Sequence, residues 1–182
     1  MRVFISGGCK NGKSTYAQIL AKRQQAGSLY YIAAMDAVDQ EDEERIAKHR
    51  QEREGQGFIT VEQPLGIENI LKKCDHDGSF LLDSLTALLA NEMFSTRSGV
   101  DCNACERITT GLIQVLSQIR HIVIVSDYIY SDAMLYDPLT EKYRKSLAAL
   151  DRLAAIHCDV VLEAAHTQII VHKGGDMFHE IH

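Results

Sequence analysis

One short segment near the start of the chain constrains the fold more than any other part of the sequence. Residues 7–14 read Gly-Gly-Cys-Lys-Asn-Gly-Lys-Ser and match the pattern G-x-x-x-x-G-K-[ST]. An apolar run precedes them, and a helical pattern begins at Lys13. Glycines let such a loop curl so that successive N–H groups point at an anion, and the following helix adds the positive end of its dipole. We therefore predict a P-loop that binds a nucleoside triphosphate through Gly7, Gly8, Cys9, Lys10, Asn11, Gly12, Lys13 and Ser14.

Two side chains at the end of this segment are expected to carry the phosphate chemistry. The Lys13 ammonium would lie on the β- and γ-phosphates, and the Ser14 hydroxyl is a hard oxygen ligand suited to Mg²⁺. We expect Lys13 to be an exposed loop cation, so that Lys13→Ala would leave the fold intact.

Short apolar runs alternate with longer helical patterns along the chain. The runs are typical of strands covered on both faces, and they lie at residues 3–6, 28–33, 80–83, 121–126, 159–162 and 168–172. Helical spacing is found at residues 13–26, 85–94, 104–119 and 139–157. This alternation predicts an α/β fold, the three-layer P-loop NTPase fold, with a mostly parallel sheet flanked by helices. Because there are only two prolines and no linker-like stretch, we expect a single nucleotide-binding domain over residues 1–182.

Residues 36–55 favour a helix but are almost wholly charged. A helix that is polar all round cannot be buried in a core, so we expect it to stand off the sheet or to line a cleft. Residues 174–182 show no pattern that predicts a structure.

Charge and cysteine content limit the partners and the compartment. A formal net charge of −6 argues against a general nucleic-acid or anionic-membrane binder, because phosphate backbones select basic faces. No apolar stretch approaches the roughly 20 residues of a membrane helix, so we expect no membrane span and a cytoplasmic protein. The five cysteines include an isolated Cys102-Asn103-Ala104-Cys105, which we interpret as free thiols rather than a zinc site.

A P-loop site also needs a carboxylate at the end of a neighbouring strand to hold the metal ion or its water. Asp83 is the last residue of one predicted strand, and Asp127 directly follows another. Either one can instead be a helix cap, so the chemistry alone leaves the choice between them open.

With these residues in view, the sequence resembles the bifunctional adenosylcobinamide kinase and adenosylcobinamide-phosphate guanylyltransferase family of cobalamin biosynthesis. The likeness covers most of the chain in one order. Besides the P-loop, it rests on Leu-Tyr-Tyr-Ile-Ala-Ala at 29–34, on Glu-Arg-Ile-Ala-Lys-His-Arg at 44–50, on Thr-Val-Glu at 60–62 and on Leu-Leu-Asp-Ser-Leu-Thr at 81–86.

The resemblance implies specific roles. It makes Asp83 the metal-side carboxylate and His49 the residue that attacks the α-phosphate of GTP and passes GMP to the phosphorylated corrinoid. It implies Mg²⁺ as cofactor, ATP and GTP as substrates, a corrinoid acceptor and a homotrimer. It also implies contacts to the guanine nucleotide from Ala34, Met35, Asp36, Arg50, Gln51, Glu52, Arg53 and Glu62.

One segment departs from the family pattern. Where the family carries N-E-V-G-x-G-I-V-P, residues 127–135 read Asp-Tyr-Ile-Tyr-Ser-Asp-Ala-Met-Leu, without the glycines that let a backbone approach a ligand closely. Two alternatives therefore stay open. One is a P-loop kinase acting on another small hydroxyl substrate without the guanylyltransferase step, and the other is a nucleotide-binding regulatory protein that hydrolyses little.

Overall fold

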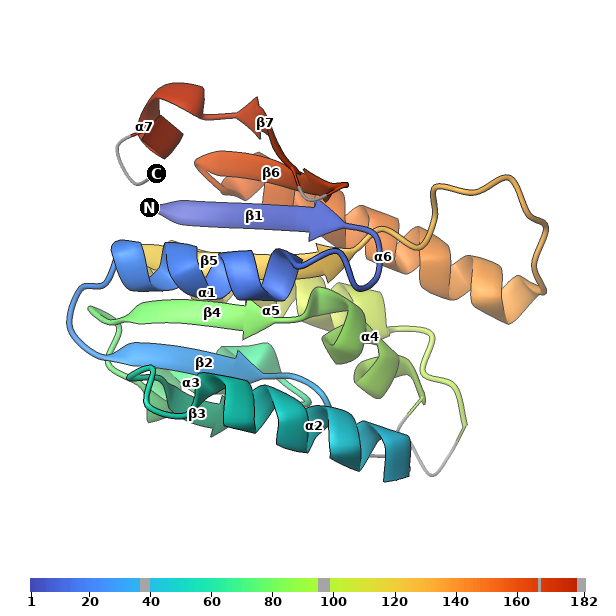
Figure 1. The fold of residues 1–182 in the computed structure, drawn as a ribbon. Helices are drawn as coiled ribbons and strands as arrows, with labels where there is room; N and C mark the ends of the chain where they lie inside the picture. The colour runs from blue at the N-terminus through green and yellow to red at the C-terminus, as the bar shows by residue number, and fades with distance from the viewer. Residues whose placement is uncertain (37–39, 95–98, 167, 180–182) are drawn as a thin grey trace.

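The computed structural model describes residues 1–36, 40–94, 99–166 and 168–179. Its centre is a seven-stranded sheet with the strand order β3-β2-β4-β5-β1-β6-β7 (Figure 1). All neighbouring strands pair in parallel except β7, which is antiparallel to β6. The strands are β1 (Arg2–Gly7), β2 (Leu29–Ala33), β3 (Ile59–Glu62), β4 (Ser79–Asp83), β5 (His121–Asp127), β6 (Val160–Ala165) and β7 (Gln168–Lys173).

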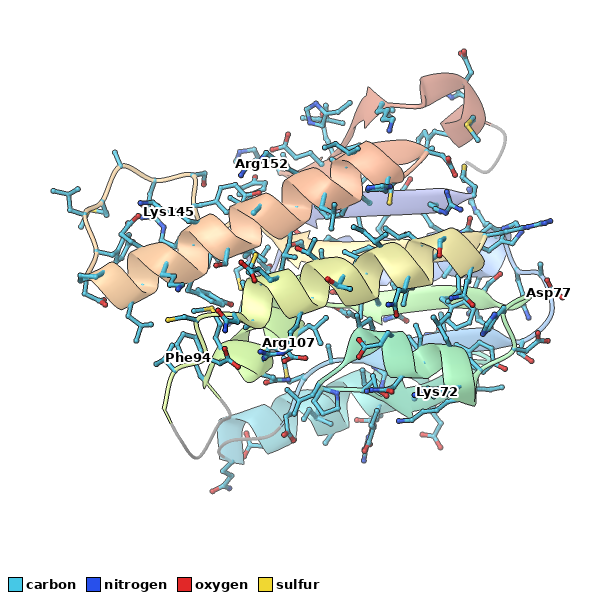
Figure 2. The ribbon with its side chains drawn as sticks, turned by 180° about the vertical axis from the view of Figure 1, so that it is seen from behind. Lys72, Asp77, Phe94, Arg107, Lys145 and Arg152 are labelled. Atoms are coloured by element: carbon cyan, nitrogen blue, oxygen red, sulfur yellow. The ribbon has the colours of Figure 1, made fainter. Side chains whose placement is uncertain are left out.

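Helices cover both faces of the sheet, which gives the three-layer α/β P-loop NTPase fold predicted from the sequence. In Figure 1, α1, α2 and α7 lie on the face nearer the viewer. Figure 2 shows the reverse face, where α5 carries Arg107 and α6 carries Lys145 and Arg152. The helices are α1 (Lys13–Arg23), α2 (Gln40–Arg53), the 3₁₀ turn η1 (Ile67–Asn69), α3 (Ile70–Lys73), α4 (Leu85–Phe94), α5 (Ala104–Gln118), α6 (Pro138–His157) and α7 (Gly175–His179). Within the described ranges, no helix is both long and apolar enough to cross a membrane.

The sheet separates two hydrophobic cores, because successive side chains of a strand point to opposite faces. Phe4 of β1 packs in the core beneath α4, α5 and α6, together with Leu147. Its neighbours Val3 and Ile5 pack in the other core, against Leu20 of α1. Each such fully buried side chain contributes about 1.5–3 kcal/mol relative to exposure, so the central strands form a rigid platform.

The sequence-based interpretation misses or misjudges several elements at the margins of the fold. Strand β3, the η1–α3 turn and α7 were not predicted, and α1 ends at Arg23 rather than near residue 26. Strand β7 was expected to be covered on both faces, but its Gln168, Ile170 and His172 side chains are exposed. The expectation is wrong because β7 is an antiparallel edge strand with one face open to solvent, so its side chains alternate between exposed and half-buried over residues 168–172.

The order of the central strands determines which residues can form a site. The carboxyl ends of β1, β4 and β5 lie at the same edge of the sheet, and β5 separates β4 from β1. Helix α1 follows the loop after β1 and packs over both β4 and β5. The first turn of α1 is therefore held above the ends of the two strands that carry Asp83 and Asp127.

Candidate nucleotide-binding site

The loop between β1 and α1 has the backbone conformation that its glycines permit. Gly12 caps α1 with a φ of 85°, in the left-handed region that favours glycine. At Gly7 an added Cβ would lie 2.6 Å from the carbonyl oxygen of Ala164 on β6, so a side chain does not fit there. Asn11 donates a hydrogen bond to that same carbonyl oxygen and accepts one from the Lys13 amide at 3.3 Å. The loop is thus fixed to the end of β6 before it enters α1.

Lys13 is buried inside this loop. Its side chain forms an ion pair with Asp127 and donates a hydrogen bond to the carbonyl oxygen of Gly8 at 3.0 Å. Only 6% of Lys13 is exposed, so the expectation of an exposed loop cation is wrong. The physical reason is that β5 brings Asp127 under the loop, and the carboxylate offsets the cost of desolvating the ammonium.

The second carboxylate lies beside Ser14. Asp83 Oδ1 accepts a hydrogen bond from the Ser14 hydroxyl at 3.4 Å, and Asp83 Oδ2 accepts one from the Tyr31 hydroxyl at 2.8 Å. The two strand-end carboxylates that chemistry alone left equivalent are therefore placed differently, with Asp83 at the serine and Asp127 at the lysine. A serine hydroxyl next to a carboxylate offers the oxygen ligands that Mg²⁺ prefers.

A buried polar network supports Asp127 from below. Thr86 on α4 accepts a hydrogen bond from the Asp127 amide at 2.9 Å, and its hydroxyl lies 3.5 Å from that of Ser126. Asp151 on α6 is 4% exposed and accepts a hydrogen bond from Tyr130 at 2.7 Å. Burial raises the pKa of Asp151 to about 6. Sequence reasoning did not find Asp151, because an acidic residue in an amphipathic helix is typical of a solvated face.

The residues implied for the guanine nucleotide follow β2 and lie along α2 and β3. Ala34 is buried, Met35 is half-buried and Asp36 is exposed, while Glu62 at the end of β3 forms an ion pair with Arg50. The backbone places His49 and Glu52 in α2, but their side chains lie outside the described part of the structure.

Arg53 at the end of α2 differs from its charged neighbours. It is 6% exposed, and its guanidinium carbon lies 3.6 Å from the centroid of the Tyr31 ring. Its Nε and Nη1 atoms make no hydrogen bond to the described residues. Arg53 lines a hollow of about 400 Å³ whose wall also includes Arg50, Gln51, Phe58 and Thr60. The expectation that the charged helix lines a cleft thus agrees with the position of its last turn.

The segment that departs from the family pattern forms a long loop between β5 and α6, which extends past the edge of the sheet (Figure 1). Arg144 of α6 is buried beneath this loop and forms ion pairs with Asp132 and Glu141. It also donates hydrogen bonds to the carbonyl oxygens of residues 129, 132 and 134. Despite this anchor, Met134 is 65% and Leu135 is 97% exposed. The loop therefore presents an apolar tip at the same edge of the sheet as the P-loop.

Comparison with known proteins gives a family for the chain. The family model described as cobinamide kinase / cobinamide phosphate guanyltransferase matches residues 3–169. No curated protein matches the chain significantly. Among solved structures, the flagellar accessory protein FlaH from Methanocaldococcus jannaschii is 14% identical with a TM-score of 0.47, over 94% of this chain and 77% of that one. A KaiC-like protein from Pyrococcus horikoshii OT3 is 14% identical with a TM-score of 0.49, over 94% of this chain and 78% of that one. Neither structural likeness is close enough to bear on activity.

Proposed function

The chain belongs to the cobinamide kinase / cobinamide phosphate guanyltransferase family, and on that premise we propose that it catalyses two successive reactions of cobalamin biosynthesis. In the first, the γ-phosphoryl group of ATP or GTP passes to the aminopropanol hydroxyl of adenosylcobinamide. In the second, GMP from GTP is attached to the new phosphate. The observation that carries the proposal is the placement of Ser14 beside Asp83 at a P-loop whose lysine is already held inside the loop.

The kinase step depends on positioning and charge, because a loose phosphoryl transition state requires little covalent chemistry from the protein. The P-loop amides bind the phosphate oxygens, and Lys13 exchanges Asp127 for the β- and γ-phosphates. Ser14 and Asp83 would hold Mg²⁺, which when bound neutralises charge on the phosphate oxygens. Each of these groups approaches from the same edge of the sheet, so the acceptor hydroxyl must enter there as well.

The guanylyltransferase step is proposed to use His49 as a nucleophile. An imidazole nitrogen of His49 forms a bond to the α-phosphorus of GTP, and pyrophosphate leaves with the electrons of the broken P–O bond. The phosphate of the corrinoid then attacks the same phosphorus and releases His49. The hollow at the end of α2 supports this assignment. Arg50 lines it together with Arg53, whose Nε and Nη1 atoms have no hydrogen-bond partner among the described residues, and both guanidinium groups offer charge-assisted hydrogen bonds to an anion.

Incubation with GTP labelled at the α-phosphate, with Mg²⁺ and without acceptor, tests the covalent step. We expect a protein-bound GMP whose bond is lost in acid and survives base, as for a phosphoramidate. His49→Ala and His49→Asn should abolish the label and keep the kinase reaction, while His157→Ala, which removes an exposed helical histidine of α6, should keep both. Absence of label on wild-type protein that binds GTP would contradict the covalent mechanism.

A second candidate function is a P-loop kinase for a different hydroxyl compound. The observation that favours it is the altered segment at residues 127–135, whose exposed Met134 and Leu135 lie at the edge where an acceptor must approach. Incubation with adenosylcobinamide, GTP and Mg²⁺, followed by mass analysis of the corrinoid, separates the two. A product heavier by one phosphate or by GDP supports the first proposal, and an unchanged corrinoid with turnover on another acceptor supports the second.

The family also leads us to propose a homotrimer, which light scattering coupled to gel filtration would test. A mass of three chains is the expected result.

A further inference from the structure

Asp83, the carboxylate proposed to hold Mg²⁺, accepts a hydrogen bond from a tyrosine to which no sequence motif gave a role. Tyr31 lies in β2 and is 4% exposed. Its hydroxyl donates to Asp83 Oδ2 at 2.8 Å, while Asp83 Oδ1 accepts from Ser14 at 3.4 Å. The two oxygens of the Asp83 carboxylate thus have different partners. One accepts a hydrogen bond from the tyrosine, and the other faces the serine at the start of α1.

The ring that carries this hydroxyl is itself fixed on two sides. The Arg53 guanidinium carbon lies 3.6 Å from the ring centroid. Phe58 meets the ring at a centroid distance of 6.0 Å and an interplanar angle of 86°. Arg53 also lines the hollow at the end of α2, so the Tyr31 ring lies between the Asp83 carboxylate and a residue of that hollow.

We propose that Tyr31 is a positioning residue of the Mg²⁺ site, which orients Asp83 toward Ser14 and links that orientation to Arg53. This inference rests on the proposed function, in which Ser14 and Asp83 hold the metal ion of a bound nucleotide. A carboxylate whose rotamer is fixed before binding loses less conformational freedom when a metal ion arrives. Hydrogen-bonding partners of metal ligands act in this way, and removing one typically lowers metal affinity about 10- to 100-fold.

The test compares Tyr31→Phe with Tyr30→Phe, since the two residues are neighbours on β2 that point to opposite faces. Tyr30 is also buried, its ring stacks on Phe80, and its hydroxyl accepts a hydrogen bond from the Asp75 amide at 3.2 Å, away from Asp83. Each variant loses one hydroxyl and keeps its ring. The measurement is the affinity for a fluorescent ADP analogue in EDTA, and again across a Mg²⁺ titration.

For Tyr31→Phe we expect the Mg²⁺ concentration at half-saturation to rise about tenfold, with the affinity in EDTA and the melting temperature close to wild type. Tyr30→Phe should leave the Mg²⁺ dependence unchanged. If Tyr31→Phe lowered the affinity for the ADP analogue equally with and without Mg²⁺, or left the Mg²⁺ titration unchanged, Tyr31 would only fill the core and the inference would be overturned. Wild-type protein that binds no nucleotide in either condition would overturn the proposed function and this inference together.

The link to Arg53 is tested by a double-mutant cycle with Arg53→Met, which keeps the length of the side chain and removes its charge. The quantity compared is the ratio of affinities with and without Mg²⁺, because any direct contact of Arg53 with the nucleotide cancels in that ratio. We expect Arg53→Met to reduce the ratio by itself and to add nothing in the Tyr31→Phe background, since coupled residues are not additive. Additive effects would refute the link.

Discussion

Replacing Asp127 by asparagine tests whether the two carboxylates of the site have different roles, with Asp127 pairing with Lys13 and Asp83 holding the metal ion. The variant keeps the size of the side chain and removes the charge that holds Lys13 in the loop. Because a bound phosphate must take Lys13 away from Asp127, we expect the same change to weaken the fold and to strengthen nucleotide binding. If Asp127 held the metal ion instead, neutralising it would lower nucleotide affinity in the presence of Mg²⁺.

The burial of the pair gives the magnitude. The side chains of Lys13 and Asp127 are 7% and 22% exposed, so the pair is only partly screened by solvent. Hydrogen bonds to charged groups contribute about 1.5–3 kcal/mol, and the open side of Asp127 places this one at the lower end. We therefore expect a loss of about 1.5 kcal/mol in the free energy of unfolding. Because about 1.4 kcal/mol corresponds to a factor of ten, nucleotide affinity should rise by up to about tenfold.

Urea unfolding gives the stability, and calorimetric titration with ADP in EDTA gives the affinity without any metal ion. Asp101→Asn is the control, because it removes one negative charge from an ion pair with Arg107 on a different part of the surface. If Asp127→Asn abolished the Mg²⁺-dependent part of the affinity while Asp83→Asn kept it, the roles of the two carboxylates would be reversed and the argument refuted.

Burial of Asp151 makes stability depend on pH. In the folded protein the Asp151 carboxyl keeps its proton up to about pH 6, whereas in the unfolded chain it loses the proton near pH 4. The free energy of unfolding therefore falls as the pH rises through this window. At pH 8 the free energy of unfolding of Asp151→Asn should thus exceed that of wild type by roughly 2–3 kcal/mol. At pH 4 the two proteins should be equally stable. Gly7→Ala should lower the free energy of unfolding by about 1–3 kcal/mol in urea, because the new methyl group meets the Ala164 carbonyl. Arg144→Met should speed hydrogen exchange across residues 128–137, since the loop loses its anchor.

Matched controls accompany these three variants. Gly8→Ala should keep its stability, since no atom lies within 4 Å of the added Cβ, and equal losses at both glycines would contradict the steric argument. Lys145→Met alters an exposed cation of the same helix, and faster exchange in that variant too would remove the role given to Arg144. For Asp151→Asn, a stability difference that does not change between pH 4 and pH 8 would contradict the raised pKa.

The central strands and the phosphate loop were predictable because their signals are local. A run such as Ile122-Val123-Ile124-Val125 is apolar throughout, which is typical of a strand buried on both faces. The glycine, lysine and serine of the loop are adjacent in sequence, so no tertiary information is needed to find them. By contrast, β3 leaves Ile59 and Thr60 exposed and is defined by backbone pairing with β2, for which the side chains give no signal.

The supporting residues of the site were not predictable because their partners lie far away in sequence. Tyr31 stands in an apolar run and resembles any core residue until the register of β2 on β4 brings it to Asp83. Lys13 looks exposed until β5 places Asp127 beneath it. Each of these contacts depends on the strand order, which the alternation of strands and helices does not specify.

The position of β1 has a consequence for how the protein is made. This strand precedes every other strand in the chain, yet both of its neighbours come late: Phe4 pairs with Ile124 on β5 and with Val161 on β6. Contacts between such distant segments form slowly, because a long stretch of chain must be closed before they are gained. A nascent chain that already includes β1 to β4 still lacks the strands that hold its phosphate loop. We therefore expect nucleotide to stabilise the chain by mass action only once β6 has joined the sheet.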